Sequence, residues 1–191
     1  MRIDMLPEIS LNVLDIAQNS ITAKAQDIRV RIETDAAAHT LAFTIRDNGC
    51  GMTPEQLAAV TDPFFTTRTT RKVGLGVPFL KQAAELSGGS FVIESAPGEG
   101  TFMQAVFRTD SVDCMPLGDI TATMHTLIVY NEQVHFVYTY AADGHAFTLD
   151  TDEFREILGD ISFQEAEISA YILQYLTENK AEADAAAEAG S

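Results

Sequence analysis

The sequence is poor in several features that define common classes of protein. It has two cysteines, Cys50 and Cys114, so it carries no disulfide framework. It has 12 basic residues against 28 acidic ones, and a formal net charge of −16 disfavours nucleic acids and anionic membranes as main partners. No apolar run approaches the roughly 20 residues of a membrane span, and no signal peptide follows Met1. These absences favour a cytoplasmic protein.

Familiar phosphate-binding motifs are also missing. The sequence has no Gly-x4-Gly-Lys-Ser/Thr loop, which excludes a Walker-type NTPase. It has no His-Arg-Asp or Asp-Phe-Gly segment, which excludes a eukaryotic-type protein kinase. Gly74-Leu75-Gly76 follows a loop-like stretch instead of a strand, which disfavours a dinucleotide-binding fold.

The 191 residues, 46% of them hydrophobic, suit one domain with an appendage. Ser10 is expected to cap a helix that runs to about residue 25. Apolar alternation predicts strands over 27–34 and 40–46, which should pair as an antiparallel hairpin. Thr53 should cap a short helix over 55–60, and a longer helix is expected over 75–86. Further predicted elements are strands over 90–95 and 101–108, a helix over 116–130, a hairpin over 134–140 and 145–149, and helices over 152–158 and 164–177.

Glycines and basic residues gather between positions 47 and 100. Gly49 and Gly51 follow a predicted strand, and Gly74 and Gly76 precede a predicted helix. Glycine lets a backbone approach a ligand closely, and free N–H groups at a helix N-terminus bind phosphate. The stretch 62–73 has no amphipathic period and contains the dense basic cluster Arg68, Arg71 and Lys72. We expect this stretch to be a mobile lid.

Five segments in the range 11–107 together resemble the ATP-binding domain shared by sensor histidine kinases, anti-sigma-factor kinases, gyrase-type topoisomerases, Hsp90 and mismatch-repair ATPases. They are similar, in chain order, to that family's asparagine box (Leu14–Ser20), first glycine box (Asp47–Met52), phenylalanine box (Phe64-Phe65), and second and third glycine boxes (Gly74–Gly76 and Gly98–Thr101). The residues of these segments are most similar to those of the histidine kinase branch.

This resemblance implies the Bergerat fold, an α+β two-layer sandwich with a mixed, mostly antiparallel sheet and helices on one face. The expected division is an ATP-binding domain over 1–108, a small α+β segment of unknown role over 109–178, and a disordered acidic tail over 179–191. A frayed helix end is the alternative for this Ala/Glu-rich tail.

The resemblance also implies a Mg-ATP site. Asp47 would accept a hydrogen bond from the adenine amino group, and Asn19 would offer an oxygen to Mg2+. Arg68 and Lys72 would hold the γ-phosphate. The other residues expected at the nucleotide are Gly49 and Gly51, which leave room for the base, Met52, which packs on it, Thr101, which supports Asp47, and Phe65, Gly74, Leu75 and Gly76 of the lid and its ends.

The sequence departs from the family pattern in informative places. Lys72 stands where the second glycine box usually has a further glycine. The ATPase branches have a catalytic glutamate four residues before the asparagine, and this position is Asp15, one methylene shorter. Asp15 is therefore the candidate general base. None of the four histidines is followed by an acidic residue, as a phosphoacceptor histidine would be, so we expect something other than a complete sensor kinase.

Three functions remain compatible with these residues. They are a kinase acting on a partner protein in trans, a slow ATPase driving a conformational cycle, and a non-enzymatic ATP sensor. The segment after Thr109 could bind a partner, form a homodimer or cover a sheet edge. The simpler alternative for Asp15 and Asn19 is a solvated helix face, and for the basic cluster a solvated loop.

Overall fold

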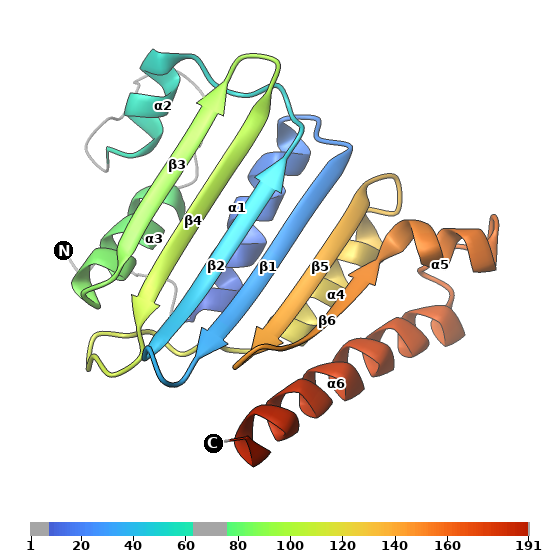
Figure 1. Ribbon diagram of the computed structural model, residues 1–191. Coiled ribbons are helices and arrows are strands. Elements are labelled where there is room, and N and C mark those ends of the chain that lie inside the picture. The colour runs from blue at the N-terminus through green and yellow to red at the C-terminus, as the bar shows by residue number, and fades with distance from the viewer. Residues whose placement is uncertain (1–7, 63–75, 191) are drawn as a thin grey trace.

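The computed structural model describes residues 8–62 and 76–190, which form two layers (Figure 1). A six-stranded sheet has the order β3-β4-β2-β1-β5-β6, and α1, α3 and α4 pack on one of its faces. The elements are α1 (Ile9–Thr22), β1 (Asp27–Asp35), β2 (Thr40–Asp47), α2 (Pro54–Val60), α3 (Gly76–Leu86), β3 (Ser90–Ala96), β4 (Gly100–Arg108), α4 (Ile120–Tyr130), β5 (His135–Ala142), β6 (His145–Asp150), α5 (Thr151–Leu158) and α6 (Ala166–Ala189).

The sheet is mixed and mostly antiparallel, as predicted. Val30 of β1 lies opposite Ile45 of β2 in an antiparallel pair and opposite Tyr138 of β5 in a parallel pair. The pairs β2–β4, β3–β4 and β5–β6 are antiparallel. The expected hairpins β1–β2 and β5–β6 are present, and the two expected strands β3 and β4 also pair with each other. The fold class inferred from the sequence is therefore confirmed.

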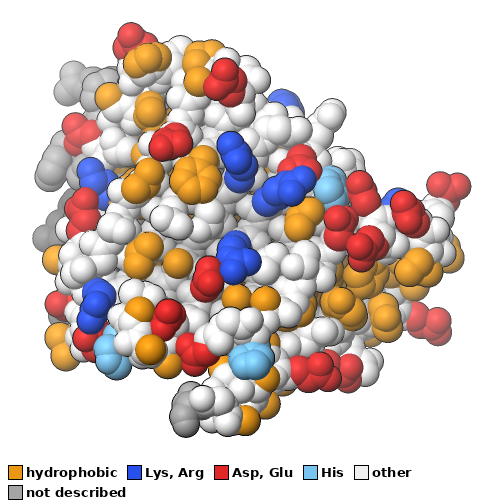
Figure 2. All heavy atoms as spheres, in the orientation of Figure 1, with side chains coloured by type: hydrophobic (Ala, Val, Ile, Leu, Met, Phe, Trp, Pro, Cys, Tyr) orange, Lys and Arg blue, Asp and Glu red, His pale blue; other side chains and the backbone are white. Residues whose placement is uncertain are grey.

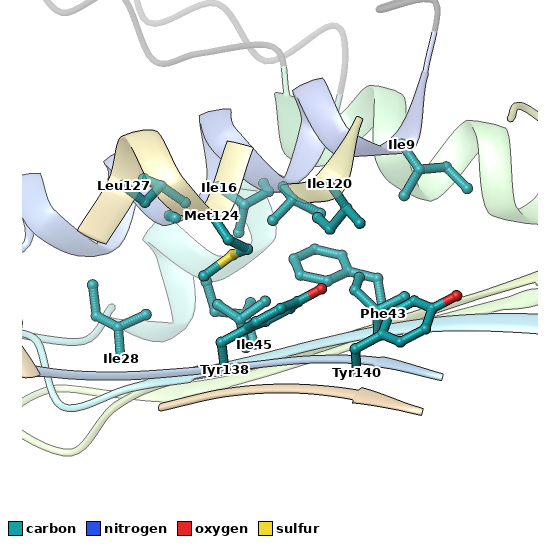
Figure 3. Packing of buried hydrophobic residues seen from close by; sticks show 14 of the residues in the cluster. Ile9, Ile16, Ile28, Phe43, Ile45, Ile120, Met124, Leu127, Tyr138 and Tyr140 are labelled. Carbon is teal, nitrogen blue, oxygen red and sulfur yellow. The ribbon is translucent and has the colours of Figure 1, made fainter. Parts of the chain in front are cut away.

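One hydrophobic core underlies the whole described chain. Alternation along β1 buries Ile28, Val30 and Ile32 and leaves the arginines between them exposed. Figure 3 shows side chains of the sheet and of the helical layer meeting in this core. Members of the cluster run from Ile9 in α1 to Ala187 near the end of α6. The segment after residue 109 therefore shares its core with the segment before it.

The C-terminal segment extends the sheet beyond β1. β5 lies beside β1 along its full length, from Asp27 opposite His135 to Thr34 opposite Ala142. α4 packs against α1, while α6 packs against α4, β5 and β6. Of the roles left open for this segment, covering a sheet edge is the one that the fold contains.

The start of α1 differs from the prediction. The helix begins at Ile9, and the residue in the N-cap position is Glu8. Ser10 lies in the first turn, where its hydroxyl donates a hydrogen bond to Glu8 Oε1 at 2.9 Å. The assignment of Ser10 as the N-cap was therefore wrong, because the helix begins two residues earlier than the apolar pattern suggested.

The end of the chain also differs from the prediction. Residues 179–189, expected as a disordered tail with a frayed helix end as the alternative, are the last turns of the 24-residue helix α6. Ala183 and Ala187 are buried, and Asp184 Oδ1 accepts a hydrogen bond from the Tyr140 hydroxyl at 2.6 Å. Small alanine side chains let these turns pack closely, so a composition that looked too weak for a core suits this position. Among the described helices, none combines the length and apolar composition that crossing a membrane requires.

Candidate nucleotide-binding site

Asp47 lies at the end of β2 with a side chain that is almost completely buried. Its Oδ2 accepts a hydrogen bond from Ser20 Oγ at 2.6 Å, and its Oδ1 accepts one from the Gly49 backbone N–H at 2.9 Å. An ionised carboxylate offers about four acceptor positions, so roughly two remain for another donor. Asp47 is thus a fixed, buried acceptor at the end of the sheet.

Ser20 is a site residue at the end of the segment similar to the asparagine box, and its role was not predicted from the sequence. It lies on the buried face of α1, one turn after Ile16 and Ala17 and two turns after Val13. A hydroxyl among apolar side chains on a buried helix face needs a hydrogen-bond partner. This position was the signal that could have identified Ser20.

Thr101 lies directly opposite Asp47 in the β2–β4 pair. In the described residues, however, the Thr101 hydroxyl is hydrogen-bonded to Ser95 Oγ at 2.9 Å, while Ser20 provides the side-chain contact with Asp47. Ser95 Oγ also accepts from the Met52 backbone N–H at 2.9 Å. Thr101 and Ser95 therefore hold the loop after β2 against the β3–β4 hairpin.

Two glycines of the segments similar to glycine boxes are required by contacts within the fold. Gly51 has φ +66°, and a Cβ there would lie 1.9 Å from the Ala96 carbonyl oxygen. Gly100 has φ +85°, and a Cβ there would lie 2.0 Å from the Asp47 carbonyl oxygen. The first and third glycine segments thus touch backbone to backbone, which only glycine allows.

Asp15 and Gly76 meet where α1 passes the start of α3. A Cβ at Gly76 would lie 1.8 Å from Asp15 Oδ2, so the absent side chain leaves the space that this carboxylate occupies. Burial raises the pKa of Asp15 above its usual value. A carboxylate with a raised pKa is better matched to proton abstraction near neutral pH.

Asn19 lies one helical turn after Asp15 and is exposed. Within the described residues its side-chain amide makes no hydrogen bond, so its oxygen is available to a ligand. The remaining predicted site residues, Phe65, Arg68, Lys72, Gly74 and Leu75, lie outside the described residues, as does nearly all of the expected lid.

A cavity of about 610 Å3 lies at the other end of the strands and contains none of the predicted site residues. The β1–β2 turn, the β5–β6 turn and the end of α6 line it, with carboxylates from Glu33, Asp35 and Asp143. Three acidic side chains disfavour a polyphosphate ligand. This cavity is therefore a poor alternative nucleotide site.

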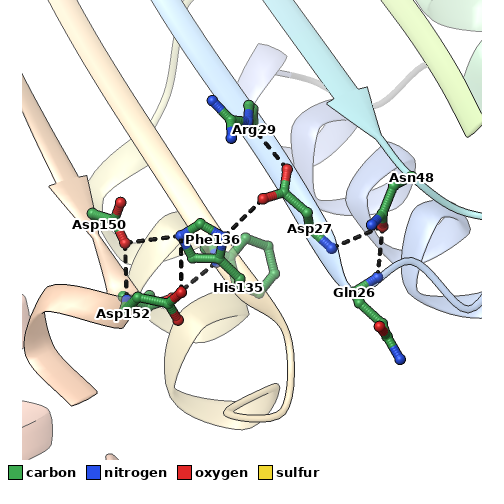
Figure 4. A network of polar contacts seen from close by, with 9 residues as sticks. Gln26, Asp27, Arg29, Asn48, His135, Phe136, Asp150 and Asp152 are labelled. Atoms are coloured by element: carbon green, nitrogen blue, oxygen red, sulfur yellow. Dashed lines mark hydrogen bonds and ion pairs between the residues drawn. The ribbon is translucent and has the colours of Figure 1, made fainter. Parts of the chain in front are cut away.

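A second polar network connects the C-terminal segment to the end of the sheet that carries Asp47 (Figure 4). His135 Nδ1 lies 2.7 Å from Asp27 Oδ2, and its Nε2 lies 2.8 Å from Asp150 Oδ1. The backbone N–H groups of Gln26 and Asp27 donate to Asn48 Oδ1 at 2.8 and 2.9 Å. Asn48 directly follows Asp47, so the network reaches the candidate site.

The ionisation state of His135 follows from its neighbours. Burial lowers its pKa, but hydrogen bonds to Asp150 and Asp27 and the charges of Asp150 and Asp152 raise it, and the net change is upward. The possible ligand atoms of His135, Asp150 and Asp152 lie within 4.8 Å of one another. Both ring nitrogens already face carboxylates, which favours a protonated imidazolium at this position over a metal ligand.

Comparison with known proteins agrees with this geometry. Residues 3–111 match the family model described as histidine kinase-, DNA gyrase B- and HSP90-like ATPase. The chain is 39% identical over 89 residues to the sensor protein kinase FleS of Pseudomonas aeruginosa, a match that covers 47% of this chain and 22% of that protein. It is 32% identical over 97 residues to the probable C4-dicarboxylate sensor kinase of Bacillus subtilis, covering 50% of this chain and 18% of that protein. The chain therefore spans about a fifth of the length of these relatives.

The fold likeness extends beyond the residues that the family model matches. The ATPase domain of Aquifex aeolicus MutL in complex with ADP aligns with a TM-score of 0.52 at 13% identity, covering 89% of this chain and 70% of that one. At this identity the alignment shows a shared fold. Together with the family match, it shows that the chain belongs to the histidine kinase-, DNA gyrase B- and HSP90-like ATPase family and has that family's ATP-binding fold.

Proposed function

We propose that this chain binds Mg-ATP between α1, the end of β2 and the start of α3, and that it acts as a kinase- or ATPase-type signalling component on a partner protein in trans. The observation that carries the proposal is the buried Asp47 carboxylate, which Ser20 and Gly49 orient at the end of the sheet. Its unused acceptor positions suit the adenine amino group. Guanine has a carbonyl oxygen at that place, so with a guanine base two hydrogen-bond acceptors, this oxygen and the Asp47 carboxylate, would face each other.

The other roles follow from the surroundings of Asp47. Asn19, exposed on the same helix as Ser20, would give Mg2+ an amide oxygen. The first N–H groups of α3 would face the phosphates, as helix N-termini do in anion sites. Arg68 and Lys72 would balance the phosphate charge in an otherwise acidic protein.

Signalling is supported by the relatives whose ATP-binding regions this chain resembles. Two of them are sensor kinases, at 39% and 32% identity over about half of this chain. In the proposal, the acceptor of the phosphoryl group belongs to another protein. A slow ATPase is the second candidate, and the half-buried Asp15 beside α3 favours it.

An ATP sensor is the third candidate, and the His135 network favours it. Asp27 contacts the C-terminal segment through its carboxylate and contacts Asn48 through its backbone N–H. If nucleotide binding moves the loop after Asp47, the contacts of Asp27 would transmit that movement to His135 at the start of β5. This function needs binding alone, without transfer or hydrolysis.

Thermal melting with ATP or GTP and Mg2+ tests the nucleotide assignment. At a hundred times its Kd, ATP stabilises a protein by about 2.7 kcal/mol, which corresponds to roughly 5–10 °C for a chain of this length. ATP should bind at least about tenfold more tightly than GTP, because an unpaired buried acceptor costs about 1–3 kcal/mol. Asp47→Asn should remove the ATP-induced shift, since it replaces one acceptor oxygen by a donor.

The matched control is Asp35→Asn, a change of the same type at the other end of the sheet. Asp47 also accepts two hydrogen bonds within the protein, so Asp47→Asn should melt at a lower temperature than the wild type without ligand. The quantity to compare between the variants is therefore the change in melting temperature that ATP causes. Equal shifts with GTP and ATP, or an undiminished shift in Asp47→Asn, would overturn the adenine assignment. Incubation with γ-labelled ATP and cell lysate then separates transfer, hydrolysis and binding alone.

A further inference from the structure

An apolar surface lies between α5 and α6, in the C-terminal segment for which partner binding was one of the roles left open. Phe154 and Ile157 of α5 and Tyr171 and Tyr175 of α6 form this surface, which we call the α5–α6 patch. The Phe154 ring centroid lies 6.1 Å from that of Tyr171 and 5.5 Å from that of Tyr175. Ile157 follows Phe154 by three residues and so adjoins it on the surface of α5.

The outer part of this patch is exposed to an unusual degree for large apolar residues. Ile157 is 84% exposed and Tyr171 is 56% exposed. Figure 2 shows hydrophobic side chains gathered on the α5–α6 side of the molecule, with carboxylates around them. Phe154 and Tyr175 are partly buried against the core, so they give the patch a rigid floor. Contiguous exposed apolar surface rimmed by polar groups marks interaction sites.

The charge around the patch is almost entirely negative. Residues 151–178 contain seven aspartates and glutamates and one basic residue, Arg155. Arg155 is occupied elsewhere, because it pairs with Glu132 at 3.0 Å and lies over the Phe163 ring at 4.1 Å. The acidic residues, by contrast, are exposed: Asp152, Glu153, Glu156, Asp160, Glu165, Glu167 and Glu178.

We propose that the α5–α6 patch docks an amphipathic helix of a partner protein, with an apolar stripe that covers Ile157 and Tyr171 and with lysines and arginines on both sides of the stripe. A second copy of this chain is disfavoured, because it would bring two acidic rims together. The proposal deepens the proposed function, on which it rests for the existence of a protein partner. Docking is measured without nucleotide, so its failure is distinguishable from failure of ATP binding.

The test uses the full chain and synthetic helical peptides in fluorescence anisotropy. The first peptide has leucines at i, i+3, i+4 and i+7 with flanking lysines. The second has the same leucines with flanking glutamates, and the third has the lysines with its leucines scattered around the helix. We expect the first peptide to bind and the other two to bind at least about tenfold more weakly. Its affinity should fall as salt is raised, because salt screens the exposed rim.

Two variants separate apolar docking from general attraction to an acidic protein. Ile157→Asp removes the exposed apolar side chain and adds negative charge, and it should weaken the first peptide by about thirtyfold or more, the level of an interface hot spot. Val112→Asp makes a comparable change at a fully exposed position between β4 and α4, outside the patch. It should leave the affinity within about twofold, and both variants should keep the wild-type melting curve.

Three outcomes would overturn the proposal. Unchanged affinity in Ile157→Asp would mean that the peptide senses charge alone. Equal affinity for the glutamate peptide would contradict the proposal that the partner helix is basic. A concentration-dependent dimer of the wild type in light scattering, abolished by Ile157→Asp, would make a second copy of the chain the occupant.

Discussion

His135 Nδ1 lies 2.7 Å from Asp27 Oδ2, and this contact joins the first residue of β5 to the first residue of β1. The Asp27 backbone N–H meanwhile donates to Asn48 Oδ1, next to Asp47. Asp150 Oδ1 takes the other ring nitrogen of His135 at 2.8 Å. One histidine therefore holds together β1, β5 and the end of β6, at the end of the sheet where the candidate nucleotide site lies.

Replacing His135 should make the free energy of unfolding less dependent on pH. Its carboxylate contacts raise the pKa of His135 in the folded state, so the folded protein binds the proton more tightly than the unfolded chain does. The stabilisation is then fully present below the unfolded pKa of about 6.5 and is lost as pH rises through the higher folded value. His135→Ala should cost roughly 1–3 kcal/mol at pH 6, the scale of hydrogen bonds to charged groups, and less at pH 9.

Urea unfolding at a series of pH values measures this difference. His145→Ala is the matched control, because His145 is exposed at the start of β6. It should leave the pH profile of the wild type unchanged. If His135→Ala costs the same at pH 6 and pH 9, the side chain stabilises by packing and the charge plays no part.

Two tyrosines of β5 should respond in opposite ways to the loss of a hydroxyl. Tyr140 donates to Asp184 Oδ1 at 2.6 Å, whereas the Tyr138 hydroxyl is buried and has no hydrogen-bond partner among the described residues. Tyr140→Phe should destabilise by roughly 1–3 kcal/mol, because a partly buried carboxylate loses one of its two donors and keeps only Lys180 Nζ at 2.6 Å. Tyr138→Phe should be neutral or stabilising, since an unpaired buried hydroxyl is itself a cost.

Denaturant unfolding of both variants gives the comparison directly. The two residues lie two positions apart on one face of β5, so each serves as the control for the other. A large loss of stability in Tyr138→Phe would mean that its hydroxyl has a partner such as a buried water. The Tyr140 result also tests whether the last turns of α6 are held in place by Asp184.

The first half of the fold was predictable because its signals are local. Alternation of Ile28, Val30 and Ile32 with charged residues gave β1, and the same pattern in the following run gave its hairpin partner. The glycine segments were recognisable because Gly51 and Gly100 fill positions that no other residue tolerates. The contacts that require these glycines are tertiary, but the residue type and its spacing can be read in the sequence without them.

The rest depended on contacts that no short window of sequence contains. The parallel pairing of β1 with β5 joins Asp27 to His135, more than a hundred residues later. The sequence of neither strand indicates that the other is its neighbour in the sheet. The hydrogen bond from Ser20 to Asp47 links a helix to a strand end in the same way. The helical end of α6 was only the alternative to a disordered tail, because its alanines look weakly hydrophobic until they are packed against the rest of the fold.

Gly76→Ala should disturb the Asp15 carboxylate directly. A Cβ at position 76 would lie 1.8 Å from Asp15 Oδ2, so the carboxylate has to rotate away. Overpacking of this kind costs typically 1–3 kcal/mol, and the lower end is expected because a side-chain tip can move. In the Asp15→Ala background the same change should be neutral or stabilising, since the clashing atoms are gone and alanine favours a helix over glycine by about 1 kcal/mol.

Chemical denaturation of the wild type, both single variants and the double variant completes this cycle. The expected coupling between positions 15 and 76 is at least about 1 kcal/mol, on the scale found for residues in contact. An equal cost of Gly76→Ala in both backgrounds would show that the glycine is needed for another reason, such as the backbone conformation at the start of α3.

Asp15→Asn separates a chemical role of this residue from a structural one. If Asp15 is the general base of a slow ATPase, the variant should keep ATP affinity within a few fold and lose turnover by about 10²-fold or more, the usual contribution of such a base. Burial raises the pKa of Asp15, so wild-type turnover should increase with pH through that raised value as the carboxylate ionises, whereas any residual turnover of the variant should lack this step.

The raised pKa of Asp15 should also make the free energy of unfolding of the wild type fall as pH rises. Ionising Asp15 costs more in the folded protein than in the unfolded chain, so the wild type should lose stability relative to Asp15→Asn as pH rises from about 3.8 through the folded pKa. Turnover by phosphate release and stability by urea unfolding, measured on one pH series, give both profiles. A variant with full turnover and a wild-type pH profile would leave Asp15 only the structural role beside Gly76.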